Sequence, residues 1–183
     1  MSHFTKTGTK VTDMNALRNA LSTMGLNLYD SAECRFYYGT SVKENVVKLP
    51  GKYDMYFEKS GDGSYEIVAD LWGGEVNKTI GNNGSTLIKQ YAIEKLKIET
   101  FKKGYSFYKI SDNRYKIVDP LDETSGYLEA VLDSEGNFTF KANGFSGSKC
   151  MKFSSLEESM GDTSCTPTAD FYKASTETLK EWN

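Results

Sequence analysis

The sequence has few of the residues that most metal and catalytic sites are built from. Its 183 residues include one histidine, His3, and three widely spaced cysteines, Cys34, Cys150 and Cys165. No CxxC pair is present, so neither a zinc-binding pattern nor a disulfide framework is indicated. A single histidine cannot complete an HExxH motif. We expect reduced thiols in a cytoplasmic protein that needs no metal or other cofactor.

Arginine is scarce and long apolar runs are missing. Only Arg18, Arg35 and Arg114 contribute to the 22 basic residues, and the net charge is −3. Recognition of phosphates and base edges favours the planar guanidinium group, so this composition disfavours nucleic acid as a partner. No stretch of about 18 apolar residues exists, and the N-terminus lacks a signal-peptide core, so we expect no membrane partner.

The first two thirds of the chain alternate between strand and helix patterns. Asp13 predicts the start of a helix over 14–24 that ends at Gly25, and the longest helix is predicted over 85–103. Strands are predicted at 2–11, 26–29, 35–38, 53–58, 65–71, 105–110 and 114–118, with 39–51 as a polar loop. This order predicts an α+β fold, a ferredoxin-like antiparallel sheet with helices on one face.

The acidic segment 119–126, which contains proline and glycine, is predicted to link two domains, 1–118 and 127–183. Beyond it, a hairpin over 127–132 and 138–142 and a helix near Phe153–Met160 predict a small ββα unit. A unit of about 57 residues is marginally stable alone, so we expect it to dock on the first domain.

Two glycine-containing loops, Gly81–Ser85 and Gly144–Ser148, precede predicted helices. Backbone amides at a helix start can hold an anion, which suggests phosphate binding. However, the first loop lacks the lysine of a P-loop, and an ordinary helix cap explains it more simply. The second resembles a hydrolase nucleophile elbow only superficially, because the chain has no histidine downstream of it.

Catalytic interpretations depend on isolated groups. Cys150 lies near a predicted helix start, where the dipole favours a thiolate, but His3 is the only base available. Four carboxylates on the predicted 53–71 hairpin suggest a divalent cation site or glycoside hydrolysis. They are Asp54, Glu58, Glu66 and Asp70. A solvated strand face explains these four residues more simply.

Aromatic residues are abundant, and several fall in the strand-rich region. They are Phe36, Tyr37, Tyr38, Tyr53, Tyr56, Phe57 and Trp72. Such residues form stacking platforms for bases, but also sheet cores and protein interfaces. Since no basic stripe accompanies them, we favour a core or a protein interface.

Several segments resemble a known family. The opening Met1–Lys6, the pair Tyr53-Asp54, the segment Ala69–Gly73 and the helix that holds Tyr91 and ends at Gly104 resemble domain-of-unknown-function family 1257. That family includes a conserved chloroplast and cyanobacterial reading frame, and the resemblance covers about residues 1–118.

The C-terminal segment is similar to a second family, number 2997. The matching segments are Gly144–Cys150, Leu156–Glu158, Met160-Gly161 and Phe171-Tyr172. In bacteria the two families are commonly neighbours, often beside an AAA+ ATPase, which implies that they act together. Neither family has established catalytic residues, and phage-encoded relatives leave a viral origin open.

The leading hypothesis is a non-enzymatic adaptor or regulatory partner, with an AAA+ ATPase as the implied partner. The alternative is a small-ligand or nucleotide-binding protein, a sequestering protein if the source is a phage. An enzyme that uses His3, Cys150 or the hairpin carboxylates is the least favoured of the three. The predicted binding residues are His3, Tyr53, Asp54, Asp70, Trp72, Gly144, Gly147 and Cys150.

Overall fold

The computed structural model describes residues 4–122, 126–145 and 153–160, except the side chains of 4–9 and Trp72. The chain divides into two compact units, residues 1–95 and 96–183. The long helix α3 (Ser85–Lys102) contributes residues to both units. Each unit has its own antiparallel sheet, so the α+β class predicted from the sequence is confirmed. The ferredoxin-like arrangement stays a prediction.

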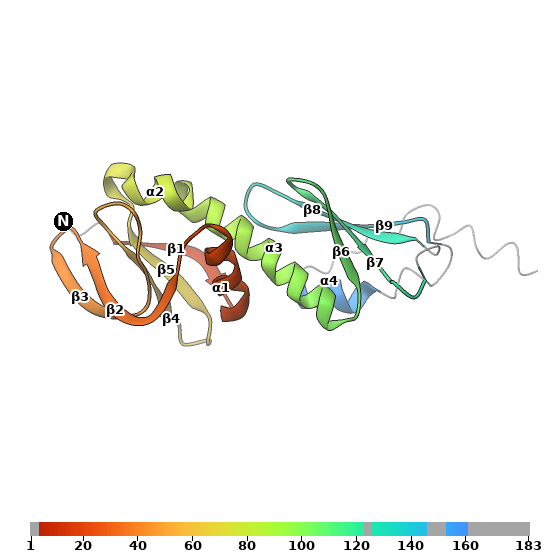
Figure 1. The fold of residues 1–183 in the computed structure, drawn as a ribbon, viewed down its shortest axis with the longest axis horizontal. Helices are drawn as coiled ribbons and strands as arrows, with labels where there is room; N and C mark the ends of the chain where they lie inside the picture. Colours follow the sequence, from red (N-terminus) through yellow and green to blue (C-terminus); the bar gives the residue numbers. More distant parts are fainter. Residues whose placement is uncertain (1–3, 123–125, 146–152, 161–183) are drawn as a thin grey trace, which may run out of the picture. The chain divides into compact units, whose positions relative to one another are not determined.

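The first unit is built on a five-stranded sheet in the order β1-β5-β4-β3-β2 (Figure 1). Its strands are β1 (Phe4–Val11), β2 (Leu28–Phe36), β3 (Gly39–Val47), β4 (Met55–Lys59) and β5 (Tyr65–Asp70). Its helices are α1 (Met14–Thr23), α2 (Glu75–Ile80) and the first turns of α3, with 3-10 turns at Trp72–Gly74 and Asn82–Gly84. The sequence pattern did not predict α2, which lies between two glycine-containing turns.

One face of this sheet forms the core of the unit. Met55 pairs with Ala69 and Phe57 with Ile67, and all four side chains are buried. The branched side chains of Ile80 and Ile88 lie close to Gly84, beside Ile67. Helix α1 adds four buried residues on one stripe, Ala16, Leu17, Ala20 and Leu21.

Helix α1 begins and ends where the sequence predicts. The Asp13 carboxylate accepts hydrogen bonds from the backbone amides of Asn15 at 2.8 Å and Ala16 at 3.0 Å. Gly25 follows the helix with a φ of +72°, a conformation that glycine adopts without strain. These two groups satisfy part of the orphan hydrogen bonds at the helix ends.

A buried tyrosine on α3 ties that helix to the start of α1. The Tyr91 hydroxyl accepts hydrogen bonds from the amides of Thr12 at 3.0 Å and Asp13 at 3.1 Å. Its side chain is 7% exposed. Because these two amides precede the first helical turn, they would otherwise depend on solvent or on another side chain.

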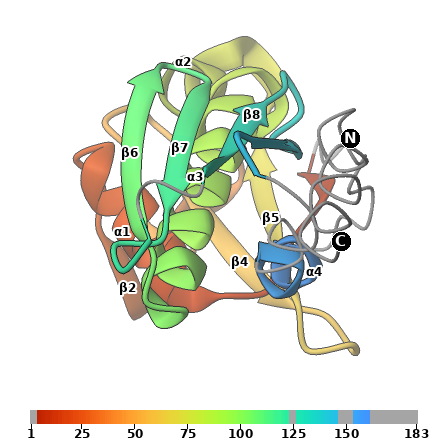
Figure 2. The same cartoon turned by 90° about the vertical axis from the view of Figure 1, so that its right-hand side faces the viewer.

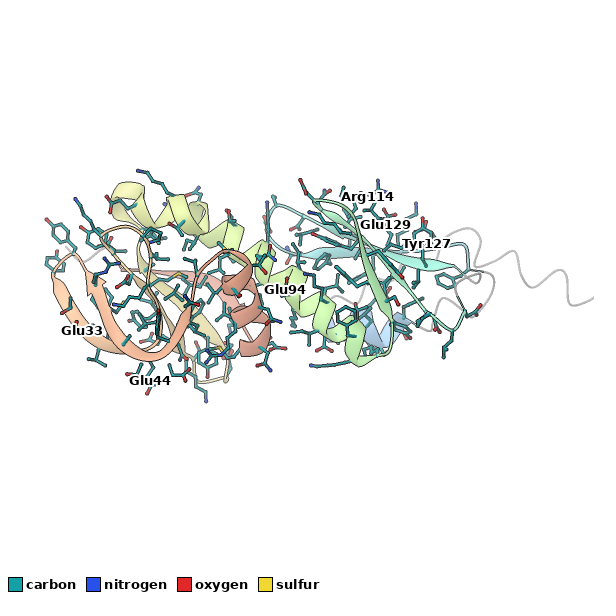
Figure 3. All side chains as sticks on the ribbon, in the orientation of Figure 1. Glu33, Glu44, Glu94, Arg114, Tyr127 and Glu129 are labelled. Atoms are coloured by element: carbon teal, nitrogen blue, oxygen red, sulfur yellow. The ribbon has the colours of Figure 1, made fainter. Side chains whose placement is uncertain are left out.

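The hairpin of β2 and β3 corrects the sequence prediction. Residues 39–51 were expected to be a loop, but Gly39–Val47 forms a full strand paired with Leu28–Phe36. Most of its side chains are exposed, including Glu33 and Glu44 on its two strands (Figure 3). Because few side chains of this hairpin are buried, its sequence lacks the apolar alternation that identifies a strand. Asn45, with φ of +53°, interrupts its regular geometry.

The second unit contains a four-stranded sheet in the order β6-β7-β8-β9. The strands are β6 (Ser106–Ser111), β7 (Arg114–Val118), β8 (Tyr127–Leu132) and β9 (Phe138–Asn143), followed by α4 (Ser154–Met160). Both hairpins predicted from the sequence are present. Strands β7 and β8, which lie on either side of the predicted linker 119–126, are direct neighbours in this one sheet.

Buried aromatic rings fill the core of the second unit, whose strands β6, β7 and β8 are labelled in Figure 2. Phe107 stacks on Tyr115 with ring centroids 5.2 Å apart, and Tyr115 contacts Phe138 at 6.0 Å. Phe153, next to α4, lies 4.7 Å from Tyr105 and 5.5 Å from Phe145. These contacts pack Phe153 against one residue just before β6 and one just after β9. Within the described part of the chain, no helix is both long and apolar enough to cross a membrane.

Replacing Tyr91 with phenylalanine tests the tie between α1 and α3. The change removes one hydroxyl and leaves two backbone amides without their acceptor, so we expect a loss of about 1–3 kcal/mol in unfolding free energy. Urea unfolding followed by circular dichroism measures it. The control is Tyr29→Phe, since that ring is 45% exposed and its hydroxyl has no partner among the described residues. Equal stability of the two variants would contradict this role.

Candidate functional site

The best-defined polar site in the first unit is built around a buried carboxylate. Asp54 directly precedes β4 and is fully buried. Its Oδ2 accepts from the backbone amide of Arg35 at 3.0 Å and from Arg35 Nε at 2.9 Å, and its Oδ1 accepts from Arg35 Nη2 at 2.6 Å. The amide of Leu49 and the Nζ of Lys48 each donate to it at 3.1 Å. Five donors therefore converge on one carboxylate.

This network fastens the β2–β3 hairpin to the beginning of β4. Arg35 lies near the tip of β2, whereas Lys48 and Leu49 follow β3. The backbone amide of Asp54 donates to the Arg35 carbonyl at 3.0 Å, and Arg35 Nη2 also donates to the Leu49 carbonyl at 2.8 Å. Lys48 Nζ donates to the Glu33 carbonyl. The far end of the hairpin is thus held by both main-chain and side-chain bonds.

The charges in this network are strongly stabilised. Burial by itself raises the pKa of Asp54, but the hydrogen bonds from Arg35, Leu49 and Lys48 outweigh it and lower the pKa from 3.8 to about 2. The bond to Asp54 also raises the pKa of Arg35. Burial, followed by the Asp54 charge, raises the pKa of the neighbouring Cys34 thiol to about 12. Cys34 is therefore a protonated core thiol and an unreactive one.

The hairpin that Asp54 fastens carries an aromatic turn. Tyr37 and Tyr38 join β2 to β3 and are 58% and 65% exposed. Their rings meet edge to face with centroids 5.0 Å apart, and Tyr53 lies 6.5 Å from Tyr37. Tyr53 directly precedes Asp54, so its backbone adjoins the carboxylate network. We call Tyr37, Tyr38 and Tyr53 the aromatic tip.

Behind the aromatic tip lies a second aromatic contact. Phe36 meets Tyr56 of β4 edge to face at 6.1 Å. The Nζ of Lys43, on β3, lies 5.3 Å from the centroid of the Tyr56 ring, within the range of a cation–π interaction. Through these side-chain contacts the β2–β3 hairpin packs against β4. The hairpin that carries the aromatic tip is therefore supported by β4.

Several predicted site residues lie outside the described part of the chain. His3, Gly147 and Cys150 do so entirely, and Trp72 is described only by its backbone, in a 3-10 turn before α2. Of the remaining predictions, Tyr53 and Asp54 come together in the network above. The binding role of Asp54 stays a prediction. In the structure its carboxylate accepts the hydrogen bonds that fasten the β2–β3 hairpin.

Asp70 and Gly144 lie elsewhere in the two sheets. Asp70 ends β5, pairs with Phe4 of β1 and is 7% exposed. Gly144 follows β9 with φ of +75°, and a side chain at this position would meet the Cα of Gly126 at 3.3 Å. A side chain at Gly126 would itself lie 2.5 Å from the Asn143 carbonyl. The close approach of two backbones therefore explains the glycine at 144.

Backbone amides of the predicted anion-binding loop Gly81–Ser85 donate hydrogen bonds within the protein. The amide of Asn83 donates to the side chain of Asn77 at 3.3 Å, and the amide of Gly84 donates to the Gly81 carbonyl at 3.0 Å. Gly81 has φ of +84°, and a side chain there would lie 2.4 Å from Thr86 Oγ1. Two of the amides that would hold a phosphate are thus already used.

The hairpin carboxylates do not gather into one cluster. Glu58 and Glu66 are register partners on β4 and β5, whereas the carboxylate of Asp54 points to Arg35 and Lys48. Among the described residues, no three His, Cys, Asp or Glu side chains lie close enough together to hold a metal ion.

Sequence reasoning missed the partners of Asp54. Arg35 is one of three arginines, and it lies in a segment correctly predicted as strand. The planar guanidinium of an arginine pairs well with a carboxylate, but a partly exposed arginine such as Arg35 can also be satisfied by water. Nothing in the pattern says that the acceptor is Asp54, 19 residues further along the chain.

Replacing Asp54 with asparagine keeps the shape but removes the charge that five donors share. We expect a loss of about 2–3 kcal/mol in unfolding free energy, because the hydrogen bonds from the partly exposed Arg35 and Lys48 are no longer made to a charged acceptor. Chemical denaturation provides the measurement. The matched control is Asp30→Asn, since the Asp30 side chain that pairs with Arg18 is 85% exposed. That exposed pair should contribute less than about 1 kcal/mol, and equal losses in the two variants would refute the assigned role.

Acidification should remove the same stabilisation. The folded-state pKa of Asp54, about 2, lies below its ordinary value of 3.8. Its contribution is therefore complete above about pH 4 and is lost as the pH falls towards 2. The stability difference between the wild type and Asp54→Asn should shrink by roughly 2 kcal/mol between pH 5 and pH 2. A difference that stays constant over this range would show that the charge is not what stabilises the hairpin.

Comparison with known proteins places the chain in a family. A chloroplast-type relative, "Uncharacterized protein ycf35" of Cyanophora paradoxa, is 28% identical over 107 residues, which is 57% of this chain and 83% of the relative. No solved structure matches the chain. The similarity of the C-terminal segment to family 2997 stays a prediction. A family model described as "Protein of unknown function (DUF1257)" matches residues 20–117, more than half of the chain, and the chain therefore belongs to the DUF1257 family.

Proposed function

We propose that this protein is a non-enzymatic interaction protein whose aromatic tip docks on a protein partner. The observation that supports this most directly is the exposure of two adjacent tyrosines on a turn that is fastened from behind by a buried ion network. Tyr37 and Tyr38 are 58% and 65% exposed, whereas Asp54 beneath them is fully buried. A rigid base with exposed rings is typical of a binding hot spot.

The chemistry of tyrosine supports a protein partner. A tyrosine ring contributes a large contact area with few rotatable bonds, and its hydroxyl can hydrogen bond at the rim of an interface. The Asp54 network reduces the entropy lost on binding because it orders the hairpin beforehand. The area of three rings is small, so additional contacts from neighbouring residues would complete a stable complex.

The alternatives have less support. Nucleotide binding was suggested by the Gly81–Ser85 loop, but two of its amides donate within the protein. A thiol enzyme would need Cys150 with His3, and both lie outside the described residues. The described part of the chain therefore favours neither alternative over an interaction protein. The nature of the partner, an AAA+ ATPase, rests on the family resemblance and is the first candidate to test.

The double variant Tyr37→Ala/Tyr38→Ala tests this proposal. We expect it to fold, since both side chains are largely exposed, and to lose at least tenfold in affinity for the partner. Tagged wild type and variant are purified from the native cells, and co-purifying proteins are quantified by mass spectrometry. A stoichiometric partner is then prepared and its dissociation constant is measured for each variant.

The control removes equally exposed side chains from the same hairpin, outside the aromatic tip. Tyr29→Ala/Val42→Ala serves this purpose, with exposures of 45% and 68% in the wild type. This control should keep the partner. If the tip variant is folded and keeps the partner with unchanged affinity, the aromatic tip is not the docking surface. A stoichiometric AAA+ ATPase in the wild-type and control samples, but not in the sample of the tip variant, would identify the implied partner.

A further inference from the structure

The sheet of the second unit has a charged face. The aromatic tip, which belongs to the first unit, is not part of it. On its buried face Phe107, Ile117 and Leu128 lie in register across three strands. Side chains alternate between the faces of a sheet, so the next residues along each strand belong to the opposite face. That face carries one continuous row across all four strands. The row is Tyr108, Lys116, Glu129 and Lys141.

The charges along this row alternate in sign. Lys116 of β7 pairs in register with Glu129 of β8, and Glu129 pairs with Lys141 of β9. A carboxylate thus lies between two ammonium groups, with one strand spacing on either side. Neighbouring strands lie about 4.8 Å apart, so the two lysines are separated by roughly 10 Å at the backbone.

Another cation already neutralises the central carboxylate. Arg114 Nε donates to Glu129 Oε1 at 2.7 Å, and the Glu129 side chain is only 9% exposed. Lys116 Nζ lies 4.7 Å from the centroid of the Tyr127 ring. Figure 3 shows Arg114, Glu129 and Tyr127 on one side of this sheet. Among the described residues, neither Lys116 nor Lys141 has a carboxylate within ion-pair distance.

The face therefore has an excess of two positive charges beside exposed apolar groups. Lys141 is exposed and Lys116 is partly exposed. At the β6 edge, Tyr108 and Ile110 are each 51% exposed. Lysine side chains are long and mobile, so both ammonium groups can adjust to a ligand that crosses the strands.

We infer that this face, defined by Tyr108, Lys116, Glu129 and Lys141, binds an extended acidic segment of a partner protein. Two acidic side chains of one extended segment can reach the two lysines, while an uncharged residue between them passes over the Arg114–Glu129 pair. The exposed ring of Tyr108 then contacts the aliphatic part of a neighbouring side chain of the segment. Charge complementarity of this kind aligns the register of a bound chain.

A single-stranded nucleic acid fits this face less well. Its phosphates are closely and evenly spaced, so one of them would lie near the buried Glu129 carboxylate. Stacking platforms offer successive exposed rings, whereas here Lys116 lies over Tyr127 and leaves Tyr108 as the ring at the open edge. Lysine also lacks the bidentate geometry with which arginine recognises phosphate.

Fluorescence anisotropy with the full chain tests the inference. The probe is a fluorescein-labelled twelve-residue peptide of alternating Glu and Thr, and labelled oligo-dT of the same length is the nucleic-acid comparison. We expect the peptide to bind more tightly than oligo-dT. The double variant Lys116→Gln/Lys141→Gln should bind the peptide at least tenfold more weakly than the wild type. Higher salt should weaken peptide binding by the wild type.

The matched control is Lys59→Gln/Lys78→Gln, which removes two exposed lysines of the first unit and changes the net charge equally. It should bind the peptide like the wild type. Equal weakening by both double variants would show non-specific charge attraction, and tighter binding of oligo-dT would indicate nucleic acid. Either result, or full affinity of Lys116→Gln/Lys141→Gln, overturns the inference. The Tyr37→Ala/Tyr38→Ala variant should keep peptide binding, so the two proposals can fail separately.

Discussion

The arrangement of the first unit depends on one buried ion network. A carboxylate such as Asp54, removed from water, is costly unless nearly all of its lone pairs are matched. Here the match comes from Arg35 on β2 and from Lys48 and Leu49 after β3, so the charge can be satisfied only when the hairpin lies against β4. The cost of burial therefore becomes a source of specificity, because any other placement of the hairpin would leave an unpaired charge.

The same constraint explains why exposed aromatic residues can be carried on a hairpin. A two-stranded arm is marginally stable in water by itself, and the outer part of this arm buries little apolar surface. With the arm fastened at Arg35 and supported by Phe36 on Tyr56, its turn can hold Tyr37 and Tyr38 in place. Polar bonds next to the turn thus permit exposed aromatic side chains on it.

The sequence predicts elements well where a local rule decides them, and less well where a distant partner does. The cap at Asp13 and the extent of α3 follow from capping and periodicity, and these predictions are confirmed. Strand β3 was missed because few of its side chains are buried. The site was only partly foreseen: Tyr53 and Asp54 were named, but the contact with Arg35 spans 19 residues and has no local signal.

The two proposed surfaces differ in kind, and that difference suggests how they would share the work of binding. Rings on a fixed turn give short-range contact energy and discriminate by shape, but they exert no attraction at a distance. Lys116 and Lys141 on an outer sheet face act over a Debye length, so they raise the rate of encounter and contribute less to the lifetime of the complex. A partner that carries both an acidic segment and a pocket for aromatic rings would satisfy both surfaces, and linking two modest contacts in one chain gives an affinity that neither provides alone.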